Sequence, residues 1–271
     1  MSKQHITSYI SQIFGKFANR EFSKPIQTLI NKGYVTFMGL DMSEFDTPNS
    51  YTTLNKLFTR EFKTPREINP KYTLISPVDA LISDCGKIKD GYAYQIKGME
   101  YKLDELLGKQ YTGFDKLLED GEFINFYLSP KDYHRYHIPM DLEVLSLSHI
   151  PGKLYPVNNR YLNKKKNLFI ENERVVIKVK DRKDKIHFLI LVGALNVGQM
   201  VVTFEERVIT NAKIQEESYY EYSDLKLKIG ELFGYFKMGS TIVMLSQKDA
   251  IIPDVKAGKS VKFGERIGAL L

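Results

Sequence analysis

Apolar residues recur at helical spacing near the start of the chain. Ile6, Ile10, Ile13, Phe14 and Phe17 are separated by steps of three or four. In an α-helix such positions lie on one face, so the pattern predicts an amphipathic helix.

A second helix is expected soon afterwards. Ser23 precedes Lys24 and Pro25, which is typical of a cap with proline in the first turn. The apolar stripe continues through Ile26, Leu29 and Ile30. Gly33 is the expected end of this helix.

The pattern changes after a third expected helix, over residues 51–62, whose buried face would be Leu54, Leu57, Phe58 and Phe62. Strand-like runs then dominate, at 123–128, 142–147, 174–180, 186–192, 200–204 and 241–245. Only one connection, 101–107, has a clear helical pattern, which argues against a doubly wound sheet. We therefore predict an α+β fold, with an N-terminal helical region (1–62) and a β-rich body (63–271).

Composition bounds the class of protein. The chain has 271 residues, 43% hydrophobic and 27% charged, which excludes a disordered or collagen-like chain. A net charge of +6 is too small to indicate nucleic-acid binding by itself. No apolar run approaches the roughly 20 residues that span a bilayer, and we expect no secretory signal. The single cysteine, Cys85, cannot form an internal disulfide.

Positive charge is concentrated in the first 34 residues. Five cations oppose one acid, Glu21; the cations are Lys3, Lys16, Arg20, Lys24 and Lys32. A basic amphipathic helix is typical of a membrane surface. The alternative, a helix that docks its apolar face on the body, stays open from the pattern alone.

Two of the five histidines, His134 and His137, lie in a segment bracketed by Pro130 and Pro139. A shaped loop of this kind often carries functional groups. A His-x-x-His pair can bind zinc, but no glutamate stands at helical spacing beside it, so we predict no metal site. Two structural histidines are the other interpretation.

Two further residues carry chemistry only if they meet a histidine. Asp79 follows Pro77 and Val78 and would by itself be a turn residue; beside a histidine it would orient the ring. Ser240 follows Gly239 just before an apolar run. Its hydroxyl could attack the Gly239 carbonyl if a base removed its proton, and glycine permits the backbone conformation that this requires.

The chain resembles the phosphatidylserine decarboxylases, which are pyruvoyl-dependent membrane enzymes, over nearly all of its length after about residue 50. The motifs that carry the resemblance are Leu57–Lys63, Ser76–Asp79, Gln95–Gly98 with Tyr101 and Leu106–Gly108, Tyr127–His137, Pro151–Asn158, Asn172–Val175, Val192–Ala194 with Asn196–Gly198, and Gly234–Thr241. The segment Tyr127–His137 matches the family pattern YLSPxDYHRxH almost letter for letter.

Two positions depart from the family pattern. Met238 replaces the usual leucine, and an apolar residue of similar size should fit the same place. Ala80 replaces a glycine, which would strain the turn if that position needs a positive φ.

The resemblance implies a chain that cuts itself between Gly239 and Ser240, into a β chain (1–239) and an α chain (240–271). His137 would deprotonate Ser240, with Asp79 orienting His137. Ser240 would attack the Gly239 carbonyl, and elimination from the resulting ester would leave a pyruvoyl group at position 240. His134 would move protons during decarboxylation.

The implied reaction converts phosphatidylserine to phosphatidylethanolamine and CO2 through a Schiff base with the pyruvoyl group, which is the only cofactor expected. The implied partners are a phospholipid membrane and the associated β and α chains, with a homo-oligomer left open, and no nucleic acid. The implied location is peripheral, on the cytoplasmic face of the cell membrane. A Ser-His-Asp lipid hydrolase is the enzymatic alternative.

The end of the chain adds a structural expectation. Residues 255–268 resemble the glycine rhythm of lipoyl and biotinyl carrier folds, which predicts short strands with glycine turns in a barrel-sandwich body. A lipoyl-like carrier is therefore the binding-module alternative, although no lysine occupies the tip position of that motif.

Overall fold

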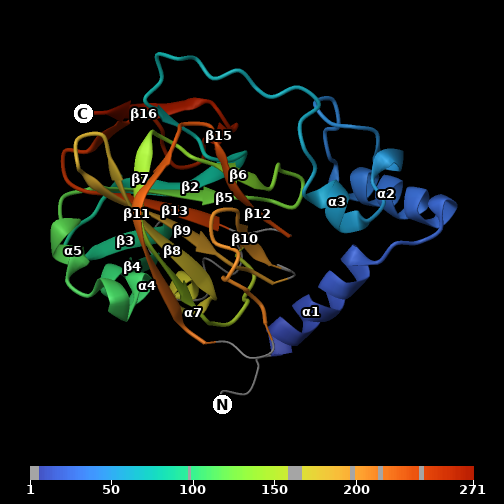
Figure 1. The fold of residues 1–271 in the computed structure, drawn as a ribbon, viewed down its shortest axis with the longest axis horizontal. Coiled ribbons are helices and arrows are strands. Elements are labelled where there is room, and N and C mark those ends of the chain that lie inside the picture. The colour runs from blue at the N-terminus through green and yellow to red at the C-terminus, as the bar shows by residue number, and fades with distance from the viewer. Residues whose placement is uncertain (1–5, 97–98, 158–166, 196–198, 213–215, 238–240) are drawn as a thin grey trace.

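The structure is a computed structural model that describes residues 6–96, 99–157, 167–195, 199–212, 216–237 and 241–271. Three helices, α1 (Ile6–Asn19), α2 (Lys24–Met38) and α3 (Leu54–Phe58), form the N-terminal region with the short turn η1 (Pro48–Ser50). They gather on one side of a body rich in strands (Figure 1). The α+β class is thereby confirmed.

The N-terminal helices follow the predicted order with two corrections. Ser23 and Pro25 stand at the start of α2 as expected. Gly33, however, lies inside α2. The helix ends at Met38 and is capped by Gly39, whose φ of 65° is the left-handed conformation that glycine adopts readily. The third helix covers only residues 54–58 of the expected 51–62.

Strands dominate the body, with a few short helical turns between them. The strands are β1 (Leu74–Ile75), β2 (Ala80–Lys87), β3 (Tyr92–Ile96), β4 (Met99–Lys102), β5 (Glu122–Tyr127), β6 (Arg135–His137), β7 (Leu142–Ile150), β8 (Arg174–Asp181), β9 (Ile186–Val192), β10 (Met200–Val202), β11 (Ser218–Leu227), β12 (Leu232–Phe236), β13 (Thr241–Ser246), β14 (Ile251–Pro253), β15 (Ser260–Val261) and β16 (Arg266–Leu270). The helical turns are α4 (Leu103–Leu107), η2 (Lys109–Tyr111), α5 (Phe114–Leu117) and α7 (Leu168–Glu171).

The main sheet is antiparallel, with the strand order β11-β7-β8-β9-β13-β5-β2-β15. Within the described residues it is open, with β11 and β15 at its edges, so no closed barrel forms. Smaller sheets are β1-β16-β14, β10-β12-β6 and β3-β4. The short C-terminal strands turn at Gly258 and Gly264, which both have positive φ, as the glycine rhythm predicts.

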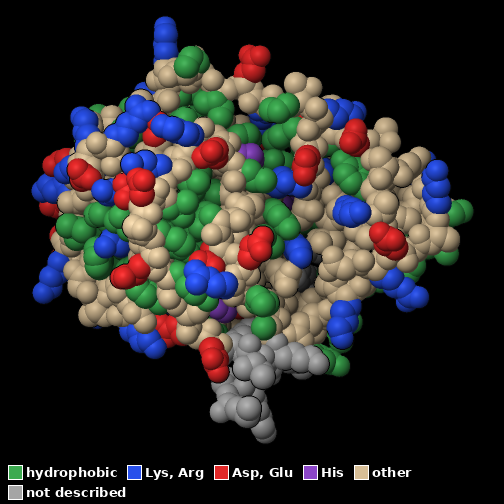
Figure 2. Space-filling view, viewed as in Figure 1, with side chains coloured by type: hydrophobic (Ala, Val, Ile, Leu, Met, Phe, Trp, Pro, Cys, Tyr) green, Lys and Arg blue, Asp and Glu red, His purple; other side chains and the backbone are tan. Residues whose placement is uncertain are grey.

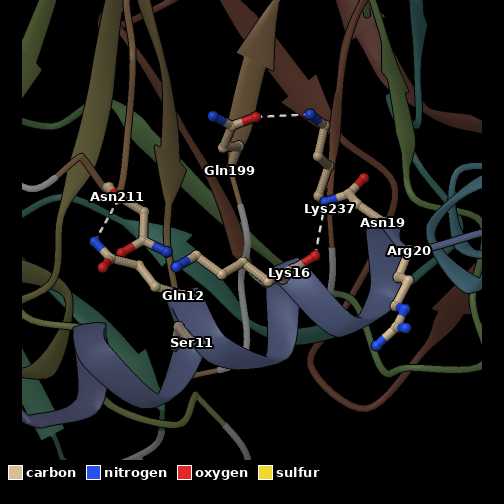
Figure 3. A pocket seen from close by; sticks show the side chains of 9 residues that line it. Ser11, Gln12, Lys16, Asn19, Arg20, Gln199, Asn211 and Lys237 are labelled. Carbon is tan, nitrogen blue, oxygen red and sulfur yellow. Dashed lines mark hydrogen bonds between the residues drawn. The ribbon is translucent and has the colours of Figure 1, made fainter.

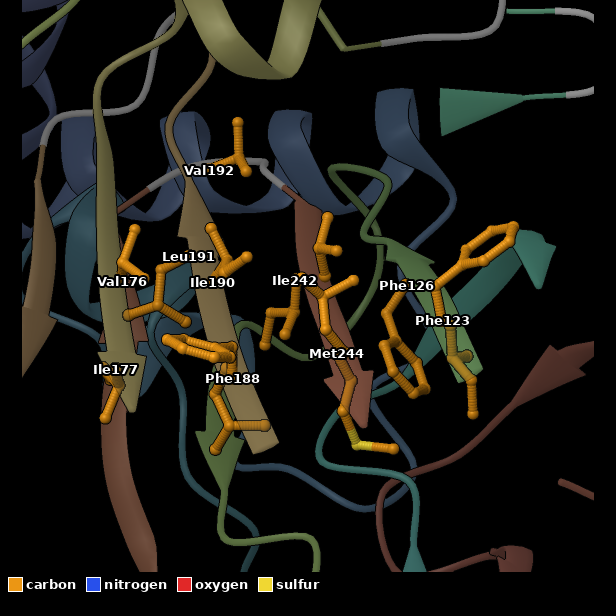
Figure 4. Packing of buried hydrophobic residues seen from close by; sticks show 14 of the residues in the cluster. Phe123, Phe126, Val176, Ile177, Phe188, Ile190, Leu191, Val192, Ile242 and Met244 are labelled. Carbon is orange, nitrogen blue, oxygen red and sulfur yellow. The ribbon is translucent and has the colours of Figure 1, made fainter. Parts of the chain in front are cut away.

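Strand β13 lies at the centre of the main sheet and is buried along its whole length. Its first residue, Thr241, pairs with Tyr127 of β5 on one side and Val192 of β9 on the other. Figure 4 shows the apolar side chains of β5, β8, β9 and β13 packed together, among them Phe126, Phe188 and Met244. Burial of such side chains stabilises the sheet by roughly 1.5–3 kcal/mol each. The core therefore fixes the position of the residue that follows Ser240.

None of the helices in the described part of the chain is long and apolar enough to cross a bilayer.

Candidate active site

The histidine segment is a turn that leads from β5 into β6. Ser129 and Asp132 close the turn, because the Ser129 N–H donates to the Asp132 carboxylate at 2.7 Å and the Asp132 N–H donates to the Ser129 carbonyl at 2.9 Å. Burial raises the pKa of the Asp132 carboxyl. The first part of the segment is therefore a loop, as predicted, whereas Arg135–His137 forms strand β6.

Strand β6 brings this loop to β12. Arg135 pairs with Tyr235, and the Phe236 N–H donates to the His134 carbonyl at 2.9 Å. Phe236 is two residues before position 238, where the candidate cleavage segment begins. Pairing between β6 and β12 therefore anchors His134 beside the end of the strand that enters this segment.

His134 is fully buried, and its ring lies against Phe58 of α3 with the ring centres 4.0 Å apart. Its Nδ1 lies 2.8 Å from the Asp132 carbonyl, which can only accept, so Nδ1 carries the proton. The Nε2 atom then has a lone pair, and it is buried with no hydrogen-bond partner in the part of the chain that the structure describes. Burial lowers the pKa of His134 to about 3. The ring is therefore neutral at pH 7, with a free base at Nε2.

His137 lies in different surroundings. Its Nδ1 donates to the Gly230 carbonyl at 2.9 Å, so its Nε2 accepts a hydrogen bond from the Tyr133 hydroxyl at 3.0 Å. The ring stacks on Phe263 with the centres 3.7 Å apart. Burial lowers the pKa of His137 to about 4. This ring is also a neutral base, but a tyrosine hydroxyl occupies its lone pair.

The two histidines have different surroundings although they are only three positions apart along the chain. His137 pairs with Leu232 of β12, whereas the His134 carbonyl accepts from the Phe236 N–H. The His134 ring contacts Phe58 of the helical region, and the His137 ring contacts Phe263 of the C-terminal segment.

Asp79 does not contact His137. Both ring nitrogens of His137 have other partners, and the Asp79 carboxylate binds the Arg66 guanidinium through both oxygens, at 2.5 and 2.9 Å. Asp79 also accepts from the Phe263 N–H at 2.7 Å. The expected orienting hydrogen bond is thus absent, because the Arg66 guanidinium satisfies the carboxylate. Asp79 instead positions Phe263, the ring on which His137 stacks.

Ala80 shows no strain. It begins β2, is buried, and does not have a positive φ. The replacement of the family's glycine is therefore compatible with the local backbone.

Residues near the end of α3 hold the histidine loop in place. Arg60 is buried and donates to the carbonyls of Lys131 and Asp132. The Arg135 guanidinium donates to the Thr59 carbonyl at 2.9 Å. The sequence had shown Leu57–Lys63 only as a motif without a role. The contacts of Arg60 show that the end of this motif holds the histidine loop. An arginine next to the buried face of a helix is the feature of the sequence that could have pointed to such a contact.

Met238, Gly239 and Ser240 lie outside the described residues. Their neighbours are described: the Lys237 N–H donates to the Gln199 carbonyl at 2.8 Å, and Thr241 begins β13. Among the described residues, neither the Thr241 hydroxyl oxygen nor His134 Nε2 has a hydrogen-bond partner, and both atoms are buried. Polar atoms in this state are costly unless a group arrives to bind them.

The described residues also contain a serine, histidine and aspartate in contact elsewhere. His187 lies 2.9 Å from the Ser246 hydroxyl through Nδ1 and 3.3 Å from the Asp181 carboxylate through Nε2. His187 and Ser246 are fully buried at the far end of β13 from Thr241. A substrate cannot reach this serine, so the cluster is structural. No group of three or more metal-ligating side chains occurs among the described residues.

Comparison with known proteins places this geometry in context. The family model described as phosphatidylserine decarboxylase matches residues 54–269. The chain is 42% identical to the phosphatidylserine decarboxylase proenzyme of Campylobacter jejuni, over 95% of this chain and 97% of that protein. It is 44% identical to the proenzyme of the same name from Helicobacter pylori strain Shi470, over 97% of each chain. The corresponding Marinobacter nauticus proenzyme is 36% identical, over 96% of this chain and 93% of that protein.

Proposed function

The chain belongs to the phosphatidylserine decarboxylase family, and on that premise we propose that it is a lyase that converts phosphatidylserine to phosphatidylethanolamine and CO2. The observation that carries this function is the pairing of β6 with β12, which joins the family's histidine segment to the strand that leads into Gly239 and Ser240. The relatives are named proenzymes, which fits a chain that must be processed before it acts.

Processing begins at Ser240. Its hydroxyl loses a proton to a base and attacks the Gly239 carbonyl, so the peptide bond is replaced by an ester. Elimination then breaks the ester and leaves a carboxylate on Gly239 and dehydroalanine at position 240, which hydrolyses to a pyruvoyl group and ammonia. A serine hydroxyl is a poor nucleophile without a base. We assign that base to His137 Nε2, with Tyr133 as the hydroxyl that already occupies its lone pair.

A pyruvoyl group at position 240 would supply a carbonyl able to bind an amine covalently and to accept the electron pair that decarboxylation releases. His134 serves that reaction through Nε2. Because this atom carries no proton in the neutral ring, it can accept one from the substrate ammonium and return it to carbon after CO2 has left. The Asp132 carbonyl fixes the tautomer, and Phe58 fixes the plane of the ring.

In this proposal Asp79 acts on His137 indirectly, through Phe263 and Arg66. It holds the backbone of Phe263, which stacks on the His137 ring, and it neutralises Arg66, whose charge would otherwise lower the pKa of His137 further. This is a positioning role in place of the direct contact first expected.

The two alternatives are not favoured. A Ser-His-Asp hydrolase needs a reachable serine, and the one cluster of that kind in the described residues is buried. A lipoyl-like carrier needs a lysine at the tip of its motif, which this sequence lacks.

The function is tested with purified protein and vesicles of carboxyl-labelled phosphatidylserine. We expect labelled CO2 and one equivalent of phosphatidylethanolamine, and denaturing mass spectrometry should show two chains that correspond to residues 1–239 and 240–271. Release of fatty acid or of free serine, or turnover by a chain that remains whole, would contradict the proposal.

The N-terminal helices are proposed to contact the membrane, because α2 exposes large apolar side chains while it packs Ile30 and Val35 against the cluster of Ala18, Leu54 and Leu57. Gln27 and Asn31 are buried and hydrogen-bonded to each other at 2.8 Å. Leu29 and Phe37, in contrast, are 74% and 83% exposed. Figure 2 shows apolar side chains beside lysine and arginine at the outer rim of this region. An exposed apolar stripe among cations fits a peripheral location on an anionic bilayer.

Replacement of Leu29 and Phe37 by aspartate should weaken binding to vesicles by about tenfold or more per residue, because burial of each such side chain contributes roughly 1.5–3 kcal/mol. Sedimentation with phosphatidylglycerol vesicles measures the effect. Ile252→Asp is the matched control, since Ile252 is 56% exposed but lies on the body. Unchanged vesicle binding by the double variant would show that α2 does not enter the bilayer.

The β and α chains are expected to stay associated after the cut, because β13 is hydrogen-bonded on both sides to strands of the β chain.

A further inference from the structure

A cavity of about 510 Å³ lies between α1 and the body. Its helical wall is Ser11, Gln12, Gly15, Lys16, Asn19 and Arg20, and its body wall is Gln199, Asn211 and Lys237 (Figure 3). The volume suits a small polar ligand or headgroup. Gln12 ties the two walls together by donating to the Asn211 carbonyl at 2.9 Å.

The lining is cationic without any acid. Lys16, Arg20 and Lys237 contribute three positive charges, and the remaining lining residues are neutral. Within the described part of the chain, none of these three cations forms an ion pair with a carboxylate. Amide side chains stand between them as further hydrogen-bond donors. A cavity with this lining attracts an anion.

Lys237 is the most constrained of the cations. Its ammonium donates to the Gln199 side-chain carbonyl at 2.6 Å, as Figure 3 shows, and this neutral amide is its only hydrogen-bond partner in the described structure. Burial lowers the pKa of Lys237. A bound anion would supply the compensating negative charge that this half-buried ammonium lacks.

The cavity borders two features of the proposed function. Lys237 is three residues before Ser240, so its Cα lies within about 11 Å of the Cα of that residue whatever path the chain takes. On α1, Lys16 stands between the cavity and the exposed apolar residues Ile13 and Phe17. A ligand here can therefore reach both the proposed reaction centre and the bilayer surface.

We propose that this cavity binds the phosphodiester of a glycerophospholipid headgroup, with Lys16 and Lys237 as the contacting cations and Arg20 at the rim. The inference rests on the proposed function, and it adds the site that holds the substrate. In a phosphoserine headgroup only four bonds separate the amine from the phosphorus. The phosphate must therefore lie close to the group at position 240, and the acyl chains must continue toward the apolar side of α1.

The kinetic test uses dihexanoyl phosphatidylserine below its critical micelle concentration, so that no membrane is present. Lys16→Met and Lys237→Met should each raise KM about tenfold, as expected for loss of a charge-assisted hydrogen bond, with kcat per cut chain within about twofold of wild type. Lys32→Met is the control, because Lys32 is an exposed cation of α2 outside the cavity. An unchanged KM in both cavity variants would overturn the proposal and leave Lys16 as a residue that serves only the bilayer surface.

A binding test separates this inference from the catalytic proposal. Uncut Ser240→Ala protein is titrated by calorimetry with glycerophosphoserine and, separately, with inorganic phosphate. Glycerophosphoserine should bind, and Lys16→Met in the same background should weaken that binding about tenfold. Preferential binding of inorganic phosphate, or no binding of either probe, would refute a headgroup site even if the enzyme decarboxylates lipid. Failure of decarboxylation with binding intact would instead count against the proposed function alone.

Discussion

Self-cleavage should stop almost completely in His137→Ala, which should accumulate as a single chain and lack all decarboxylase activity. The serine hydroxyl needs a base, and His137 Nε2 is a neutral lone pair held by the Tyr133 hydroxyl. Loss of a positioned base typically lowers a rate by about 10²–10⁴. A gel of freshly synthesised chain against time measures the cut fraction.

Tyr133→Phe is the matched comparison, because it removes the hydroxyl from Nε2 and keeps the ring that stacks near Phe62 and Phe263. If the hydroxyl relays the proton, this variant should cut slowly. If it merely occupies the lone pair, the variant should cut at least as fast as wild type. Normal cutting by His137→Ala would assign the base elsewhere, and His134, which is nearer to the cleavage segment along the strand, would then be the first candidate.

The rate of self-cleavage should fall less at acidic pH than it would if the base were a histidine of ordinary pKa. Because burial lowers the pKa of His137 to about 4, the ring stays neutral at pH 5.5, and the cutting rate there should be close to that at pH 7.5. A histidine of ordinary pKa would lose about tenfold over this range. The free energy of unfolding depends on the same group. Below about pH 6.5 the His137 side chain takes up a proton in the unfolded chain but not in the folded one, so the free energy of unfolding falls as the pH is lowered from about 6.5 to about 4.

His134→Ala should show the opposite division of effects. The chain should still cut itself, but turnover of phosphatidylserine per cut chain should fall by about 10²–10⁴, because the unpartnered Nε2 is the proposed proton carrier. Labelled CO2 release, divided by the amount of cut chain, gives the relevant rate.

The buried position of His134 calls for a second variant. His134→Gln keeps a polar side chain against Phe58 but cannot take up a proton, so it should be as slow as His134→Ala while losing less stability. His187→Gln is the control for the loss of a buried histidine away from the site. Normal turnover by cut His134→Gln would remove His134 from the decarboxylation step.

The strands of the core could be predicted from the sequence because their burial imposes long apolar runs. The expected 186–192 coincides with β9, and 174–180 falls within β8. Strand β11 was missed because it forms an edge of the sheet, where alternate side chains face solvent and the apolar signal is weak. The short strands β6 and β12, which build the site, depend on long-range pairing that no local pattern specifies.

The sequence indicated which residues to consider for the site, but it did not indicate which residues they contact. The resemblance implied that Asp79 orients His137, but in the structure the Asp79 carboxylate binds Arg66, which offers it two charge-assisted hydrogen bonds. The expected apolar stripe of α2 is divided in the structure. Ile26 and Leu29 are exposed, whereas Ile30 packs against the cluster of Ala18, Leu54 and Leu57. The sequence pattern does not specify which of these side chains face the protein.

The central place of β13 has a consequence for the lifetime of the cut enzyme. In an uncut chain, unfolding and refolding are events within one molecule. In the proposed two-chain enzyme, Thr241–Ser246 would belong to a separate molecule that must bind again between β5 and β9, so refolding would depend on protein concentration. At low concentration, unfolding would therefore be difficult to reverse. Durability of the mature protein would be set by how slowly it opens and not by its equilibrium stability.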